Sequence, residues 1–128
     1  MRILYIVLML AVIVGHFLFA YRQFTDWEGL AEGLLALTDT TAIMKTETLG
    51  RSFAAYNAAI GLGLALSFLL ASGARFKVQI AVLAFIVFTA IFGWTGTMEQ
   101  SNIILYLRLL PALAALIVTV IYSRSQSA

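Results

Sequence analysis

Residues 3–21 read ILYIVLMLAVIVGHFLFAY, an apolar run in which His16 is the one strongly polar side chain. About 20 such residues are needed for a helix to cross the hydrocarbon core of a bilayer. Three further runs of similar length follow, at residues 53–71, 78–94 and 103–122. They lack the alternation of a transmembrane β-barrel, the only other spanning architecture. The sequence therefore predicts an all-α integral membrane protein, an antiparallel bundle of four transmembrane helices forming a single domain over residues 1–128.

The composition excludes several classes of protein. Mean hydropathy is +1.00, with 62% hydrophobic and 11% charged residues, whereas soluble domains have about 45–50% and about 25%. Cysteine is absent, which excludes disulfides, thiolate metal sites and thiol chemistry. A net charge of +2 is too small to indicate a nucleic-acid partner. Arg2 before the first run resembles a secretory signal, but no small-x-small cleavage site follows, so we expect a retained anchor.

Lysine and arginine indicate the topology. One side of the predicted bundle carries Arg2, Arg75, Lys77 and Arg124 without an acidic residue. The other carries three basic and six acidic residues, Arg22, Lys45, Arg51, Asp26, Glu28, Glu32, Asp39, Glu47 and Glu99. Short cytoplasmic loops are enriched in Lys and Arg. We therefore expect a bacterial inner-membrane location with both termini cytoplasmic.

The connection over residues 22–52 is too long to be structureless in a compact domain. Its segment Thr25-Asp26-Trp27-Glu28 fits a capping box with Thr25 as the cap. Apolar residues then recur at helical spacing, at Trp27, Leu30, Leu34 and Leu37, which predicts a short amphipathic helix. From Thr41 the chain can be helical again, with Glu47 and Arg51 spaced for an i,i+4 pair.

Polar side chains gather at one depth of the predicted bundle. His16 lies in the outer half of the first helix, and Gln23 and Trp27, seven and eleven residues later, would share its face. The neighbouring runs bring further polar or aromatic residues to that depth, so the candidate ligand-binding set is His16, Gln23, Trp27, Tyr56, Asn57, Trp94, Glu99 and Arg108. We expect neither a metal nor a cofactor, because a metal needs several ligands and the chain has one histidine.

Arg108 and His16 each leave two interpretations open. A charge at membrane depth is costly, so Arg108 either anchors an anion or headgroup, or pairs internally or snorkels to the interface. Pro111, three residues later, frees a carbonyl and can kink the helix. His16 suits either an interhelical hydrogen bond or, more weakly, general acid–base catalysis. Asn57 fits an interhelical hydrogen bond first, and Tyr56 and the tryptophans fit an interfacial aromatic belt.

At these residues the chain resembles a family of small bacterial four-helix membrane proteins catalogued as domain of unknown function 1304. The resemblance rests on His16 and Trp27 eleven residues apart, on Tyr56-Asn57 followed by small residues, and on Pro111-Ala112. Family members carry Glu, Glu and Gln where this chain has Gly15, Gln23 and Arg108. The resemblance implies the four-helix fold and assigns no activity.

Several functions fit this sequence. The first is a protein that binds a lipid-like or amphipathic ligand in an outer-leaflet polar pocket, or an accessory subunit of a membrane complex. The others are a small transporter or channel subunit, and a membrane enzyme acting on a lipid-like substrate with His16 as acid or base. Membrane lipids are the expected partners, with a homo-oligomer or a larger membrane complex as further possibilities.

Overall fold

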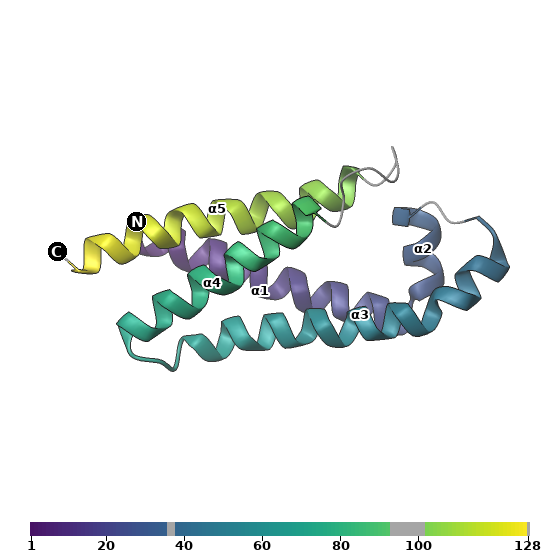
Figure 1. Ribbon diagram of the computed structural model, residues 1–128, viewed down its shortest axis with the longest axis horizontal. Coiled ribbons are helices and arrows are strands. Elements are labelled where there is room, and N and C mark those ends of the chain that lie inside the picture. The colour runs from purple at the N-terminus through teal and green to yellow at the C-terminus, as the bar shows by residue number, and fades with distance from the viewer. Residues whose placement is uncertain (36–37, 93–101, 128) are drawn as a thin grey trace.

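The chain folds into helices throughout the part that the computed structural model describes, residues 1–35, 38–92 and 102–127. There are five helices in this part, α1 (Arg2–Thr25), α2 (Trp27–Leu35), α3 (Thr40–Ser67), α4 (Ser72–Phe92) and α5 (Asn102–Ser127). Both termini and the turn between α3 and α4 lie at one end of the bundle, and α2 lies at the other (Figure 1). The predicted all-helical class is confirmed.

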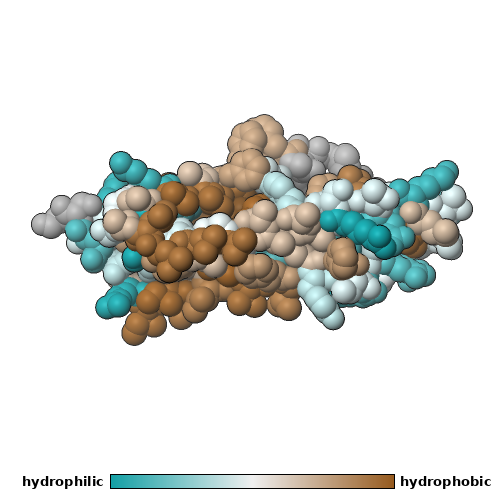
Figure 2. Space-filling model, turned by 90° about the horizontal axis from the view of Figure 1, so that it is seen from below, coloured by the Kyte–Doolittle hydropathy of each residue, from teal (hydrophilic) through white to brown (hydrophobic). Residues whose placement is uncertain are grey.

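Three of the described helices are long and apolar enough to cross a membrane, over Arg2–Thr25, Ser72–Phe92 and Tyr106–Gln126. The predicted second crossing, residues 53–71, falls largely within α3, which ends at Ser67 and is not among the three. The four-crossing bundle therefore stays a prediction. In Figure 2 a band of apolar surface, drawn brown, covers the visible face between two more polar ends, and the polar region at the α2 end is the broader one.

The helices form two pairs, α1 along α3 and α4 along α5, joined mainly where α1 also meets α5. Although a short turn links α3 to α4, α4 runs diagonally away from α3 toward α5 (Figure 1). Between the pairs lies an apolar core whose buried members come from four helices, Tyr5, Met9, Val12, Ile13, Leu64, Phe76, Leu83, Ile86, Ala112 and Ala115. Many other large apolar side chains are exposed, as expected of helices that face lipid.

The helices extend beyond the apolar runs, because backbone hydrogen bonding continues into the polar flanks. α3 begins at Thr40, thirteen residues before the predicted run at residue 53, and the Asp39 carboxylate caps it by accepting from the Thr41 amide at 2.9 Å. The predicted restart of the helix near Thr41 is thus confirmed. So is the i,i+4 pair, with Arg51 Nη2 2.8 Å from Glu47 Oε1. The connection over 22–52 consists mostly of the end of α1, all of α2 and the first half of α3.

The predicted capping box is wrong by one residue. Thr25 ends α1, and its hydroxyl donates to the Tyr21 carbonyl at 2.7 Å. Asp26 caps α2 instead, accepting from the Gly29 amide at 3.2 Å and from Arg22 Nη2 at 3.0 Å. The Arg22 guanidinium, aided by the Gly29 amide, holds the pKa of the Asp26 carboxyl below its usual range. This carboxylate thus stabilises the corner at which α1 ends and α2 turns back over the bundle.

Candidate functional site

A pocket of about 220 Å³ opens among α1, α2, α3 and α5. Five of the predicted site residues line it, namely His16, Gln23, Trp27, Asn57 and Arg108. The rest of its wall is apolar and comes from Ala11, Val12, Gly15, Phe19, Leu30, Phe53, Leu107 and Pro111. A largely apolar wall with a few convergent polar groups is a common form of ligand site.

His16 is held by its own helix. Its side chain is 7% exposed, and Nδ1 lies 2.8 Å from the Val12 carbonyl oxygen. A carbonyl can only accept a hydrogen bond, so Nδ1 carries a proton. The other nitrogen, Nε2, is buried and has no hydrogen-bond partner among the described residues. His16 therefore lines the pocket and carries a buried nitrogen whose hydrogen bonding is not satisfied by that part of the chain.

Gln23 and Asn57 join the two helices of the first pair. Asn57 Nδ2 donates to Gln23 Oε1 at 2.7 Å, linking α1 to α3 at the pocket wall. This matches the interhelical role expected first for Asn57. In a membrane such bonds contribute about 0.6 kcal/mol on average. The pair therefore adds a modest polar contact between α1 and α3 in the wall of the pocket.

Arg108 is half-buried on α5, and its Nε and Nη2 atoms are fully covered. Neither nitrogen has a hydrogen-bond partner in the described part of the chain. The guanidinium interacts with the Tyr56 side chain, and Arg108 shares the pocket wall with His16. Arg108 thus lies in the wall of the pocket, and the choice between an anion anchor and snorkelling to the interface stays a prediction.

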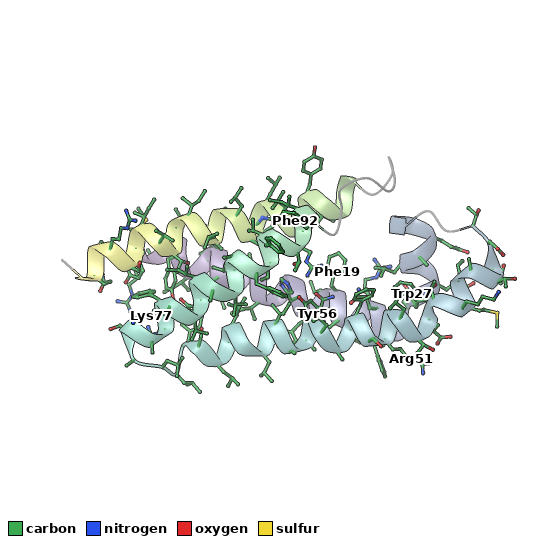
Figure 3. The ribbon with its side chains drawn as sticks, in the orientation of Figure 1. Phe19, Trp27, Arg51, Tyr56, Lys77 and Phe92 are labelled. Carbon is green, nitrogen blue, oxygen red and sulfur yellow. The ribbon has the colours of Figure 1, made fainter. Side chains whose placement is uncertain are left out.

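Trp27 is the first residue of α2, and its side chain packs against α3 (Figure 3). Its indole Nε1 donates to the Ile43 carbonyl at 3.2 Å and to Thr46 Oγ1 at 3.1 Å. The ring packs so closely on α3 that a Cβ at Gly50 would lie 2.5 Å from Trp27 Cε3. The expectation that Trp27 continues the His16 face of one helix is wrong, because the chain turns at Asp26. Trp27 reaches the same pocket from α2, the helix that covers this end of the pocket and forms its roof.

Tyr56 belongs to a different surface. It lines a shallow apolar groove of about 400 Å³ between α3 and α4, together with Ala59, Ile60, Gly63, Ala81, Val82 and Phe85. Its ring centroid lies 6.1 Å from that of Phe85. Tyr56 therefore acts on the pocket only through Arg108. Trp94 and Glu99, the remaining predicted members, lie outside the described residues.

Sequence reasoning did not find the apolar wall of the pocket. Phe19 and Leu107 resemble any other lipid-facing or core residue in sequence, so no local signal marks them. It also missed a buried polar chain at the opposite end of the bundle. There the Tyr5 hydroxyl donates to Gln79 Oε1 at 2.7 Å, and Gln79 Nε2 donates to Ser67 Oγ at 2.9 Å. A glutamine within an apolar run is a signal that could have indicated this contact.

Neither a metal site in the described part of the chain nor a curated relative identifies the protein, but a family model does. Nowhere in the described residues do three side chains of the types His, Cys, Asp or Glu lie together as a metal site would require. No curated protein and no solved structure matches the chain. The model of a family described as "Protein of unknown function (DUF1304)" matches residues 7–120. The chain therefore belongs to this family, as the resemblance of its polar residues indicated.

Proposed function

We propose that this chain is a four-crossing inner-membrane protein that binds the acidic headgroup of an amphipathic ligand in the pocket among α1, α2, α3 and α5. The observation that carries the proposal is the guanidinium of Arg108, whose Nε and Nη2 are buried without a partner in the described part of the chain. A buried charge is unfavourable unless it is paired. An anionic group in the pocket would supply the missing partner.

The packing of α3 supports a fourth crossing. α3 lies alongside α1, a candidate span, so a membrane that surrounds α1 also surrounds the second half of α3. Its 28 residues make a helix of about 42 Å, longer than the roughly 30 Å hydrocarbon core. The half that carries Lys45, Glu47 and Arg51 would project beyond the hydrocarbon together with α2. Four crossings also agree with termini at one end of the bundle (Figure 1).

The basic residues of the opposite end support cytoplasmic termini. Arg2, Arg75, Lys77 and Arg124 lie in the helical segments at that end, and Figure 3 shows Lys77 there, far from Trp27. With this end cytoplasmic, the pocket would face the outer leaflet under its α2 roof. Its volume of about 220 Å³ is below the roughly 300–1,000 Å³ of pockets that enclose whole drug-sized ligands. It therefore suits a headgroup whose apolar tail lies among the helices and lipids outside.

Native mass spectrometry in mild detergent tests the proposal. We would compare the wild type with Arg108→Gln, and use Arg124→Gln as a matched control because it removes the same charge from an exposed position of the same helix. The expected result is an acidic adduct on the wild type and on Arg124→Gln that is lost from Arg108→Gln. An adduct retained by Arg108→Gln, or a bare wild-type chain after incubation with anionic lipids, would contradict the proposal. A bare chain with a protein partner would favour an accessory subunit.

A further inference from the structure

Two residues that line the pocket carry three buried polar atoms without a partner among the described residues, and these atoms differ in hydrogen-bonding character. Two are Arg108 Nε and Nη2, and the third is His16 Nε2. All belong to side chains that line the same cavity. Because nearly every buried polar group in a protein is hydrogen-bonded, the identities of these atoms describe the group that completes the site.

The two arginine nitrogens are donors that point along one edge of the guanidinium. Nε and Nη2 carry parallel N–H bonds in a planar fork, which matches two oxygens of one carboxylate or phosphate. These two donors suit an oxyanion, which accepts from both. A single uncharged carbonyl would neither match both donors as well nor balance the positive charge. The described lining of the pocket contains no Asp or Glu.

The histidine nitrogen is an acceptor. The contact of Nδ1 with the Val12 carbonyl at 2.8 Å places the proton of a neutral imidazole on Nδ1, so Nε2 presents a lone pair. A second proton on the ring would add a positive charge beside Arg108 in a buried site, which is unfavourable. His16 Nε2 therefore requires a donor, and a simple carboxylate has none to offer.

We infer that the ligand is a hydroxylated acid, with its oxyanion on the Nε–Nη2 edge of Arg108 and a nearby hydroxyl donating to Nε2 of His16. This inference rests on the proposed function and specifies the chemistry of the same pocket. The Gln23–Asn57 pair adds polar wall for the remaining oxygens of such a headgroup. Phe53 and Leu107 line the pocket and are partly exposed, so they offer apolar surface to the tail of such a ligand.

Two sources share this chemistry, a free hydroxy acid and a lipid headgroup with hydroxyls beside its phosphate. Each can be tested with a pair of probes that differ in hydroxyl groups alone. The free acids are hexadecanoic acid and 2-hydroxyhexadecanoic acid, and the lipids are phosphatidylpropanol and phosphatidylglycerol. Binding of each probe to the purified protein in detergent would be measured by competition in native mass spectra.

The wild type should favour the hydroxylated member of at least one pair by about 3- to 10-fold, the effect of one net hydrogen bond. His16→Phe should bind both members equally, whereas His16→Gln, which returns a carbonyl acceptor at the same distance along the side chain, should restore the preference. Which pair shows the effect identifies the source. Arg108→Gln should lose affinity for all four probes.

The outcomes separate this inference from the proposed function. Equal binding of both members of each pair by the wild type, with loss in Arg108→Gln, would overturn the hydroxyl assignment and leave the acidic-headgroup proposal standing. A hydroxyl preference that persists in His16→Phe would overturn the role of His16. If the wild type binds none of the probes, the proposed function itself is wrong. The wild-type comparison needs no variant, so poor folding of His16→Phe would not prevent a result.

Discussion

Replacing Gly50 by alanine should lift the α2 roof from the pocket. The new Cβ would lie 2.5 and 2.6 Å from Trp27 Cε3 and Cδ2, whereas carbon atoms pack at about 3.5–4.0 Å. The indole must therefore retreat by about 1 Å. Its Nε1 already lies 3.2 Å from the Ile43 carbonyl and 3.1 Å from Thr46 Oγ1, so that movement breaks both hydrogen bonds.

The size of the effect follows from opposing contributions. Overpacking costs about 1–3 kcal/mol, and a buried indole N–H left without a partner costs about 1–3 kcal/mol. Alanine returns up to about 1 kcal/mol through its greater helix propensity. The docking of α2 on α3 should therefore weaken by a few kcal/mol, which is a large share of what a nine-residue helix can gain from packing.

Trp27 itself reports the change. In a Trp94→Phe background it is the only tryptophan, and its side chain is 9% exposed. Gly50→Ala should increase acrylamide quenching and shift the emission to the red. Gly63→Ala is the matched control, because no atom lies within 4 Å of its added Cβ, and it should leave both signals unchanged. Equal quenching of the Gly50→Ala and Gly63→Ala proteins would refute the packing of Trp27 on α3.

Three further predictions concern stability. The first uses a double-mutant cycle of Tyr5→Phe and Gln79→Met, measured by unfolding in detergent. The 2.7 Å bond between these side chains should give a coupling energy of about 0.5–1.7 kcal/mol. Additive effects of the two substitutions would show that the bond contributes nothing to stability. The pKa of Asp26 is lower in the folded protein than in the unfolded chain. Its stabilisation of the α1–α2 corner is therefore complete above the unfolded pKa near 4 and is lost as pH falls through the lower folded pKa. Trp27 emission should change in acid in the wild type and stay constant in Asp26→Asn. Glu47→Gln breaks an exposed ion pair and should alter the free energy of unfolding by less than about 0.5 kcal/mol; a larger loss would mean that the pair is shielded, for example by a partner.

The sequence by itself determined the helical class, three of the four predicted apolar spans and the end of the bundle near which polar residues gather. These properties are local, because hydrophobicity and helical periodicity act over a few turns of one segment. The contact between α1 and α3 through Gln23 and Asn57 also agrees with their expected depth. The N-cap of α2 was misassigned by one residue, since Thr25 and Asp26 are both good caps and the choice depends on where α1 ends.

Tertiary structure alone decided which of these residues share a cavity. The rotation of each helix about its axis, and the turn at Asp26, place Trp27 in the roof and direct Tyr56 into a separate groove. The unsatisfied atoms of His16 and Arg108 appear only when helices distant in sequence are packed together. Composition and spacing set how deep a side chain lies in the bundle, but the neighbours it meets depend on contacts between helices, which no single segment encodes.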